Sequence, residues 1–292
     1  MSTGILQTGK KLAPLQLANG KQLPFDHPLV MGIVNITPDS FYDGGKYVNA
    51  ENAIEQVNKL LTEGADIIDL GAASTRPGAE LISCEDELKR ILPVLDVIVT
   101  KHPNAIISID TFRSEVAERC IEHGAAIIND ISGGTLDEKM FDTVAKLNVP
   151  YIIMHVQGTP QNMQVEPTYN NVVTEVYDFL AGRVDAARTA GIKQIVVDPG
   201  FGFGKTIEHN YLLLRNLSKF KELGLPILTG VSRKSMINKV LKTKPENALT
   251  GTIALNTLAV LQGTNILRVH DVKEAKQVIK LVNQFLCPDT EI

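Results

Sequence analysis

The feature that most constrains this chain is a repeated unit in which one glycine separates an amphipathic stretch from a short apolar run. The amphipathic stretches have helical spacing, as in residues 50–63, where apolar side chains fall on one face. The units are Gly64 before ADIIDLG, Gly124 before AAIINDIS, Gly191 before IKQIVVDPG, Gly224 before LPILTGVS and Gly263 before TNILRVHD. A glycine after a helix takes the left-handed conformation that ends it, and an unbroken β-branched run is typical of a strand buried on both faces. The chain is therefore predicted to alternate helices with buried parallel strands.

Three further apolar runs fit the same strand role without the glycine, at residues 29–35, 105–110 and 151–155. About eight strands then alternate with helices, which is the number in a closed (β/α)8 TIM barrel of the α/β class. An open doubly wound sheet has the same alternation and is the main alternative, but strand count and chain length favour the barrel. We predict a single barrel domain over 28–286, with a short N-terminal extension (1–27) across one barrel end and a C-terminal tail (287–292). The last two helices are expected at roughly 236–262 and 272–286, with apolar faces that could pack on the barrel or on a second subunit.

The composition excludes several classes of partner. Lys and Arg number 29 against 33 Asp and Glu, a net charge of -4, so no global field recruits nucleic acid or an anionic membrane. No run approaches the roughly 20 apolar residues of a membrane helix, and the N-terminus lacks the long apolar core of a secretory signal. The three cysteines, Cys84, Cys120 and Cys287, are widely spaced and are expected as reduced thiols. We therefore expect a cytoplasmic protein that binds any anionic ligand through a local cluster of cations.

Polar side chains follow nearly every apolar run. Since a parallel barrel has its active site at the carboxyl ends of its strands, these residues are the candidates for chemistry. Contact with water explains any one of them, but not why carboxylates, amides and cations all emerge on the face where they converge. In chain order the candidates are Asn35, STRPG at 74–78, Asp110, Asn129 with Asp130, His155, Asp198 with PGFGFGK, Ser232 to Lys234, and Arg268 to Asp271.

Two simpler sites fail on inspection. GFGFGKT (200–206) resembles a phosphate-binding loop, but the first glycine of that motif would fall at Pro199, and a dinucleotide fingerprint would need glycine at Lys205. The six histidines lack the spacing of a metal site. Asn35 remains a candidate hard oxygen ligand for Mg²⁺, an ion held by one or two protein oxygens plus substrate phosphates.

Taken together and in order, the segments resemble the dihydropteroate synthase family from about residue 28 to residue 286. They are VMGIVNITPDSF (30–41), STRPG (74–78), ISIDT (107–111), AAIINDISGG (125–134), MHVQGTP (154–160), VDPGFGFGK (197–205), TGVSRKS (229–235) and LRVHD (267–271). The resemblance implies an α/β barrel that joins 6-hydroxymethyl-7,8-dihydropterin diphosphate to p-aminobenzoate, releasing pyrophosphate and forming 7,8-dihydropteroate for folate synthesis. It also implies Mg²⁺ as cofactor, a homodimer, and sensitivity of the family to sulfonamides.

The resemblance assigns the pterin diphosphate to one set of residues. Carboxylates and an amide would recognise the ring, a lysine would donate to its carbonyl side, two apolar residues would pack on it, and a threonine, an arginine and a histidine would meet the diphosphate. In that order the residues are Asp110, Asp198 and Asn129, then Lys234, then Met154 and Phe203, then Thr75, Arg268 and His270. Asn35 would meet the same diphosphate through Mg²⁺. The alternatives are helix-capping carboxylates, a solvated lysine, and a rim ion pair between Arg268 and Asp271 or another carboxylate.

The p-aminobenzoate site is assigned to two loops and one strand end. Phe41 and Pro77 would form apolar walls, Ser232 would bind the carboxylate, and Asp43 and Arg76 would close the loops, which are expected to be mobile. Ordinary loop packing is the alternative for Phe41 and Pro77.

The sequence departs from the family's commonest pattern at two places. Gly71-Ala72-Ala73 stands where Gly-Gly-Glu is frequent, and Gln157 stands where arginine is frequent. No acidic role is therefore assigned at 71–73, and a phosphate contact from the loop at Gln157 is left in doubt.

The chemistry expected is substitution at the exocyclic CH₂ of the pterin. A neutral aryl amine needs no strong general base, and the electron-rich dihydropterin can share positive charge with that carbon, so we expect an SN1-like path. Asp110, Asp198, Lys234, Arg268 and His270 would be the catalytic residues. A pterin-binding methyltransferase barrel and a catalytically inactive pterin-binding barrel are the alternatives, and neither would need to keep both SRK and RVH.

Overall fold

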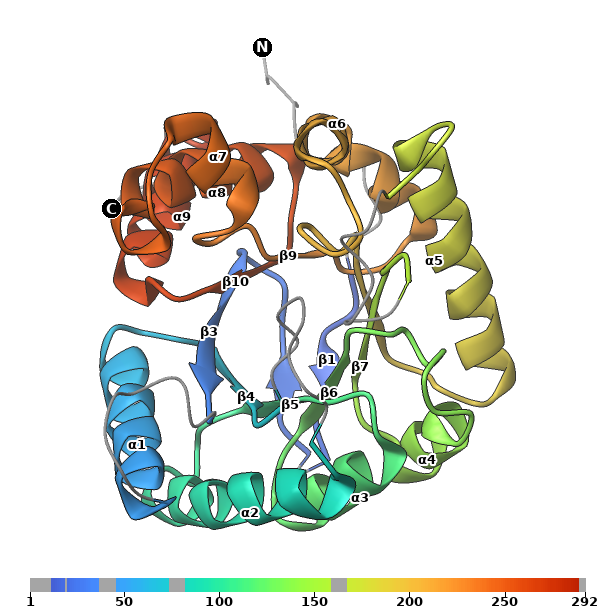
Figure 1. The fold of residues 1–292 in the computed structure, drawn as a ribbon, viewed down its shortest axis with the longest axis vertical. Helices are drawn as coiled ribbons and strands as arrows, with labels where there is room; N and C mark the ends of the chain where they lie inside the picture. The colour runs from blue at the N-terminus through green and yellow to red at the C-terminus, as the bar shows by residue number, and fades with distance from the viewer. Residues whose placement is uncertain (1–11, 19, 37–45, 74–81, 159–166, 289–292) are drawn as a thin grey trace.

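Eight parallel strands form a barrel in the computed structural model, which describes residues 12–18, 20–36, 46–73, 82–158 and 167–288 (Figure 1). The strands are β3 (Leu29–Asn35), β4 (Ile67–Gly71), β5 (Ile107–Asp110), β6 (Ile127–Asp130), β7 (Tyr151–Met154), β8 (Ile195–Asp198), β9 (Leu228–Thr229) and β10 (Ile266–Val269). Neighbours follow chain order from β3 to β8, β3 also pairs with β10, and β10 pairs with β9. A parallel bridge between Val197 and Ile227 joins β8 to the entrance of β9. The barrel prediction is confirmed, because a doubly wound sheet would not pair its first strand with its last.

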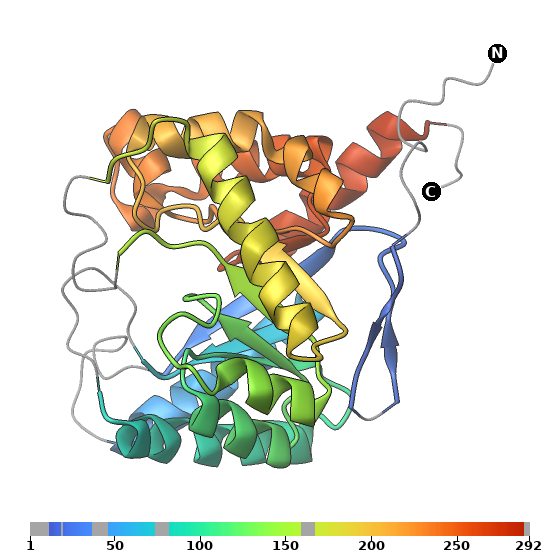
Figure 2. The same ribbon diagram turned by 90° about the vertical axis from the view of Figure 1, so that its right-hand side faces the viewer.

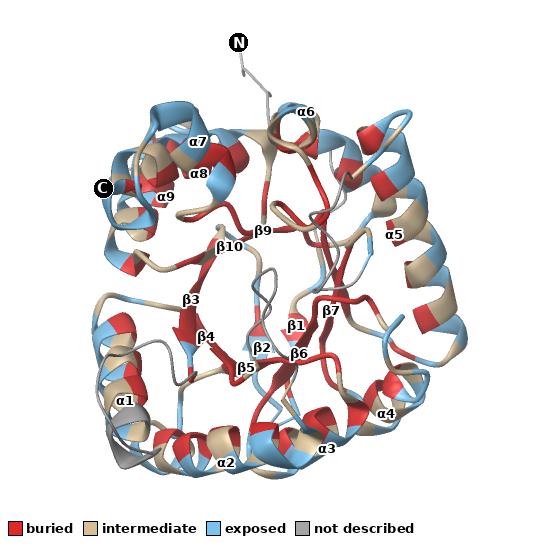
Figure 3. Ribbon diagram, in the orientation of Figure 1, coloured by how far each residue is buried: buried red, intermediate tan, exposed pale blue. Residues whose placement is uncertain are grey.

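The helices surround the barrel and turn their buried faces toward the strands, as Figures 1 and 3 show. They are α1 (Lys46–Thr62), α2 (Cys84–Lys101), α3 (Ser114–Glu122), α4 (Met140–Leu147), α5 (Val172–Thr189), α6 (Ile207–Arg215), α7 (Ser235–Leu241), α8 (Leu249–Gln262) and α9 (Val272–Leu286), with 3₁₀ segments at Leu217–Leu223 and Pro245–Asn247. The predicted glycine ends are confirmed; Gly263, for example, has φ of 92° and its N–H bonds the carbonyl of Val260 after α8. None of the described helices is long and apolar enough to cross a membrane.

One predicted helix, over 236–262, is wrong as a single element. Lys242 takes the left-handed conformation (φ 52°) and ends α7, and Pro245 then begins a 3₁₀ turn before α8. The turn between α7 and α8 holds the Arg233 side chain, because the carbonyls of Pro245 and Glu246 each accept a hydrogen bond of 3.0 Å from Arg233 Nη1.

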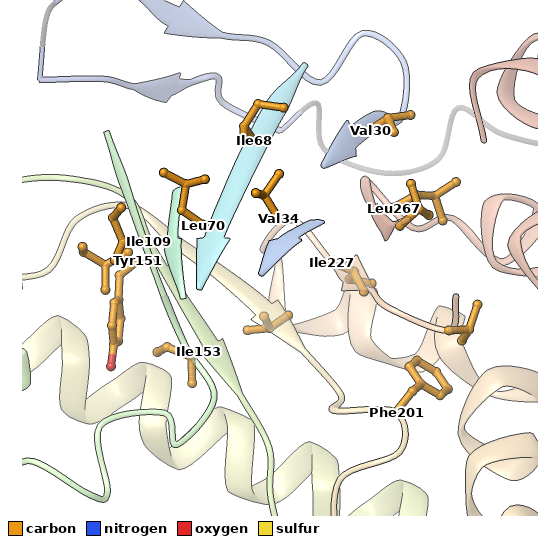
Figure 4. Packing of buried hydrophobic residues seen from close by; sticks show 14 of the residues in the cluster. Val30, Val34, Ile68, Leu70, Ile109, Tyr151, Ile153, Phe201, Ile227 and Leu267 are labelled. Carbon is orange, nitrogen blue, oxygen red and sulfur yellow. The ribbon is translucent and has the colours of Figure 1, made fainter. Parts of the chain in front are cut away.

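Side-chain alternation divides the apolar core into two parts. Strand residues such as Val30, Ile68 and Ile109 face outward and pack against the helices (Figure 4). Their neighbours Met31, Ile67 and Ile152 face inward and fill the lower part of the barrel, where the strands begin.

The described part of the N-terminal extension lies at that lower end. A two-stranded hairpin, β1 (Leu15–Gln16) and β2 (Gln22–Leu23), packs Leu15, Leu17 and Leu23 on the inward apolar residues (Figure 2). Gln194 Nε2 donates a 2.8 Å hydrogen bond to the carbonyl of Gln16, which fastens the hairpin beside the start of β8. The hairpin closes the bottom of the barrel, so the opposite end is the one left for a ligand.

Candidate active site

The inward side chains change from apolar to polar on going up the barrel. On four strands, the residue two positions after an inward apolar residue is polar and also points into the barrel. These residues are Asp69 on β4, Asn129 on β6, Asp198 on β8 and Arg268 on β10, and Asp110 on β5 lies at the same level. All four acidic and amide groups are buried, with exposures of 0% to 9%. The strand period of two therefore concentrates carboxylates, an amide and a guanidinium at the carboxyl end of the barrel.

Arg268 ties two of the carboxylates together. Its Nε donates to Asp69 Oδ2 at 2.7 Å and its Nη2 to Asp110 Oδ2 at 2.6 Å. Asp69 Oδ2 also accepts from Asn129 Nδ2 at 3.0 Å. In this structure Arg268 is therefore paired with carboxylates, as the alternative interpretation expected. Its partners are Asp69 and Asp110, whereas Asp271 pairs with Arg233.

The network carries more negative than positive charge in a buried place. Burial raises the pKa of Asp110 to about 7, with the Arg268 guanidinium opposing and the Asp69 carboxylate adding to the rise. Burial alone would lower the pKa of Arg268, but Asp69 and Asp110 raise it above its usual value. Arg268 is therefore a permanent cation, and Asp110 is the carboxyl that changes charge near neutral pH.

Three groups offer hydrogen bonds to a ring in the lumen. Asp110 Oδ1 is buried and has no partner among the described residues. Asp198 Oδ1 accepts the Gly200 N–H at 2.7 Å, and burial raises the pKa of Asp198 while Lys234 opposes the rise. With Asn129 they form a set of two carboxylates and one amide, which suits the N–H donors and ring-nitrogen acceptors of an amino-pyrimidinone. This is the combination expected from the sequence.

Lys234 reaches the same lumen from the start of α7, over a turn made of glycines. Its Nζ donates to the carbonyl of Phe201 and lies 4.7 Å from the centre of the Phe203 ring. A side-chain carbon on Gly202 would lie 3.0 Å from Lys234 Cδ, so glycine is needed there for the lysine to pass. Burial lowers the pKa of Lys234 to about 8, with Asp198 opposing. The lysine is a half-buried cation held beside a buried carboxylate.

A small apolar cluster, separate from the main core, lines the mouth of the barrel. It contains Met154 and Phe203, both expected from the sequence, together with Phe112, Ile131 and Val156. Flat apolar contacts above a polar floor fit an aromatic heterocycle.

Ser232 lies after the end of β9 and His270 after the end of β10, and the side chain of Ser232 contacts the backbone of His270. Ser232 Oγ accepts the His270 N–H at 3.3 Å. Burial, reinforced by Arg268, lowers the pKa of His270 to about 4, so the imidazole is neutral at pH 7 and offers a hydrogen bond rather than a charge. Arg233, which stands between Ser232 and Lys234 in the chain, has φ of 55° and donates hydrogen bonds to both carboxylate oxygens of Asp271, at 2.9 and 2.6 Å. This clamp fixes the turn that presents Ser232 and Lys234.

The place proposed for a metal lies beside Gly71. A side-chain carbon built on Gly71 would lie 3.7 Å from Asp110 Oδ2 and 3.8 Å from Asn35 Oδ1, so both oxygens border one small space that the glycine keeps open. Asn35 is exposed at the end of β3. In the described part of the chain no group of three or more His, Cys, Asp or Glu side chains gathers as metal ligands. The oxygens present fit an ion that takes few protein ligands, as Mg²⁺ does.

Several residues expected from the sequence lie outside the described part of the chain. They are Phe41, Asp43, Thr75, Arg76 and Pro77. Their roles stay predictions. Gln157 is described, and its side chain exchanges hydrogen bonds of 2.9 and 3.2 Å with the backbone of Thr168, which joins the two ends of segment 158–167.

Two polar residues of the site were missed by sequence reasoning. Asp69 sits inside the run ADIIDLG, two residues above the inward Ile67, and strict alternation along that strand would have placed it in the lumen. Lys205 was considered only as part of a nucleotide motif. Asp130, in contrast, faces outward: Tyr151 and the Ser132 and Gly134 backbone bond its carboxylate.

The comparisons with known proteins agree with this geometry. Residues 31–270 match the family model described as pterin binding enzyme. The class defined by fold and site is thus a pterin-binding α/β barrel.

Relatives that match most of this chain identify its family more closely. The Escherichia coli K12 protein named dihydropteroate synthase is 42% identical over 272 residues, covering 92% of this chain and 95% of that protein. The Xanthomonas albilineans dihydropteroate synthase with 4-aminobenzoic acid has a TM-score of 0.88 at 40% identity, covering 94% and 98%. The same enzyme in complex with 7,8-dihydropteroate gives 0.84 at 38% identity, covering 94% and 98%. The chain belongs to the dihydropteroate synthase family.

Proposed function

We propose that this protein condenses 6-hydroxymethyl-7,8-dihydropterin diphosphate with p-aminobenzoate, forming 7,8-dihydropteroate and pyrophosphate for folate synthesis. The observation that carries the proposal is the buried set of Asp110, Asn129 and Asp198 with Lys234 and Arg268 at one level of the lumen. The solved relatives named above hold p-aminobenzoate and dihydropteroate, which are a substrate and the product of this reaction.

The roles of the pterin residues follow from their hydrogen-bonding capacity. The unpartnered Asp110 Oδ1 and the second oxygen of Asp198 accept ring N–H groups, and Asn129 serves an adjacent edge. Lys234 donates on the carbonyl side of the ring, and Met154 and Phe203 pack on its faces. Buried partners of this kind reject a ring that lacks the matching donors.

The reaction is a substitution in which the bond from the exocyclic CH₂ to the diphosphate oxygen breaks ahead of attack by the amine. In their ionised forms Asp110 and Asp198 stabilise the positive charge that spreads over the pterin, because both carboxylates lie in a place shielded from water. Arg268 and the neutral His270 meet the departing pyrophosphate with a cation and a hydrogen-bond donor. The amine attacks in its neutral form, and the proton that it then loses passes to the released pyrophosphate or to water.

Asn35 would hold Mg²⁺ beside Asp110, in the space that Gly71 leaves open. The ion would supply charge neutralisation at the diphosphate of the substrate.

Replacing Asn35 with alanine is expected to raise the Mg²⁺ concentration for half-maximal rate roughly tenfold, the effect of losing about 1.4 kcal/mol of binding. Activity as a function of free Mg²⁺ measures this, and the rate at saturating Mg²⁺ should recover most of its original value. An unchanged Mg²⁺ dependence would remove Asn35 from the metal site.

The rate is expected to depend on pH through two buried groups. Asp110 has a pKa near 7 and must be ionised to accept the ring N–H, so kcat/KM for the pterin diphosphate falls below about pH 7. Lys234 has a pKa near 8 and must be protonated to donate, so the same quantity falls above about pH 8. The profile should be a narrow bell, and Asp110→Asn should abolish its acid limb. A flat profile from pH 6 to pH 9 would contradict both assignments.

The function is tested by pyrophosphate release from 6-hydroxymethyl-7,8-dihydropterin diphosphate and Mg²⁺, with and without p-aminobenzoate. Release that depends on the amine, with dihydropteroate formed, supports the proposal. Tight pterin binding without release would point to an inactive barrel or a pterin-binding methyltransferase, and a corrinoid-dependent assay would separate the two.

We further propose a homodimer formed through α7, α8 and α9, which lie together in Figure 1. The apolar residues of α8 divide between two faces: Leu255 and Val260 are buried on the barrel, Ile253 packs against it, and Leu258 and Leu261 are exposed. The adjoining helices also expose large apolar side chains, namely Val240, Leu241, Leu281 and Phe285. Such a grouping is typical of a subunit interface.

Replacing Leu258 and Phe285 together with aspartate is expected to convert the dimer to a monomer in sedimentation analysis. Because both side chains are already exposed in the single chain, the free energy of unfolding of the monomer should change by less than about 0.5 kcal/mol. A wild-type chain that sediments as a monomer at micromolar concentration would refute the dimer.

A further inference from the structure

The glycine turn after β8 holds a buried lysine that the proposed reaction does not use. Lys205 is 4% exposed. Its Nζ donates to the carbonyls of Gly200 and Phe203 and to His155 Nδ1, each at 2.9 Å. Three acceptors meet the three hydrogens of one ammonium group, and the carbonyl of His155 lies at 3.4 Å as well. Burial lowers the pKa of Lys205 well below its usual value and that of His155 to about 2, so His155 is neutral and accepts.

The lysine lies where two loops pack backbone to backbone. A side-chain carbon on Gly200 would collide with the carbonyl oxygen of His155, and one on Gly204 would lie 2.5 Å from the carbonyl oxygen of Gln157. Tyr169 adds a 2.8 Å hydrogen bond to the carbonyl of Gly204. The turn 200–204 is therefore pressed against the segment after β7, with the Lys205 ammonium bonded to both.

The same turn forms one wall of the ligand site. Asp198 at its start receives the Gly200 N–H, Phe201 offers its carbonyl to Lys234, and the Phe203 ring lies under Lys234 Nζ. Three carbonyls of this turn accept hydrogen bonds from lysines: those of Gly200 and Phe203 from Lys205, and that of Phe201 from Lys234. A buried lysine thus holds the turn that carries Phe203 and accepts from Lys234.

We propose that Lys205 is a positioning residue for pterin recognition, which fixes the 200–204 turn and so sets where Phe203 and Lys234 meet the ring. The inference rests on the proposed function, because it assumes that a pterin occupies the lumen. Burying an ammonium is costly unless every hydrogen is bonded, so its presence here indicates that the geometry of the turn matters.

Lys205→Met tests the proposal, since methionine keeps most of the length of the side chain and removes the amino group with all three donors. We expect the Kd for 6-hydroxymethyl-7,8-dihydropterin diphosphate to rise roughly ten- to hundredfold, the cost of misplacing a recognition group by about an ångström. At saturating pterin diphosphate, the KM for p-aminobenzoate should stay within about twofold of the wild-type value, which a general loss of structure would not produce. The chain has no Trp, so pterin fluorescence reports binding without overlap from tryptophan.

Lys276→Met is the matched control. Lys276 pairs with Asp66 at 2.6 Å near the start of β3 and β4, at the other end of the barrel, and its loss should leave pterin Kd unchanged. A double-mutant cycle with Phe203→Leu then shows whether Lys205 acts through the turn: the double variant should bind pterin about as weakly as the weaker single variant. Strictly multiplicative effects, or wild-type affinity in Lys205→Met, would overturn the proposal.

A second variant covers the case in which Lys205→Met does not fold. Gly204→Ala leaves the lysine in place but pushes the turn away from Gln157, so it should weaken pterin binding in the same way. Gly204→Ala with unchanged affinity would contradict the inference. If the wild-type protein itself fails to bind the pterin diphosphate, the proposed function falls and the inference with it; if the wild type binds and the variants match it, only the inference falls.

Discussion

Replacing Asp198 with asparagine is expected to lower kcat/KM for the pterin diphosphate by at least about 100-fold, equivalent to about 2.7 kcal/mol of transition-state stabilisation. Asparagine can still accept the Gly200 N–H that Asp198 Oδ1 accepts at 2.7 Å, so the turn should keep its shape. What is lost is the negative charge, which both receives ring N–H groups and raises the pKa of Lys234 against the effect of burial. The variant therefore weakens two contacts to the ring at once.

Steady-state kinetics with both substrates measure the effect, and Asp130→Asn is the matched control. Asp130 is a buried carboxylate at the same level of the barrel, but it faces outward and bonds Tyr151 and the β6 turn. Asp130→Asn should lower the free energy of unfolding while kcat/KM of the folded enzyme stays within about threefold of the wild-type value.

Lys234→Ala should lower kcat well over tenfold, because it too removes a contact to the ring. Near-wild-type turnover in both Asp198→Asn and Lys234→Ala would refute the site.

The architecture was predictable from the sequence because its determinants are local. Glycines such as Gly64 and Gly263 end helices through a backbone conformation that other residues adopt only with strain, and β-branched runs then define buried strands. The helix predicted over 236–262 failed for an equally local reason, since Lys242 accepts a left-handed conformation without being glycine. The spacing of apolar residues does not reveal a non-glycine residue that ends a helix in this way.

The pairing of charges was not predictable, because it depends on how distant strands meet. Arg268 and Asp69 are 199 residues apart in the chain, and nothing near either of them indicates the other. The sequence places a guanidinium and several carboxylates at the strand ends, but the partner of each is fixed only when the barrel closes and β3 pairs with β10. Lys205 was missed for a related reason: two of its acceptors are backbone carbonyls, which no sequence motif records, and the third is His155, 50 residues away.

Asp69→Asn is expected to reduce both stability and catalysis, because Asp69 holds Arg268 and Asn129 with a single oxygen. An amide can turn its oxygen toward the same two donors, but the buried site of Oδ1 then receives an N–H₂ group in place of an oxygen that has no described partner. The guanidinium also loses one of its two counter-charges and is left to Asp110 alone. We expect the free energy of unfolding to fall by about 3–5 kcal/mol, the range for breaking a buried ion pair.

The catalytic effect of Asp69→Asn separates a structural pair from a functional one. If Asp69 directs the guanidinium, kcat/KM for the pterin diphosphate should fall at least about tenfold at temperatures where the variant is fully folded, as urea titration with an unchanged m-value would verify. Asp66→Asn is the control, since Asp66 pairs with Lys276 and is a fifth exposed at the far end of the barrel, and it should affect neither quantity by more than about 1 kcal/mol. An Asp69→Asn variant that is less stable but fully active would mean that Asp110 alone orients Arg268. Full activity and full stability together would mean that the buried pair with Asp69 has no role in the site, and that the charge balance around Arg268 is set by Asp110 and Asp198.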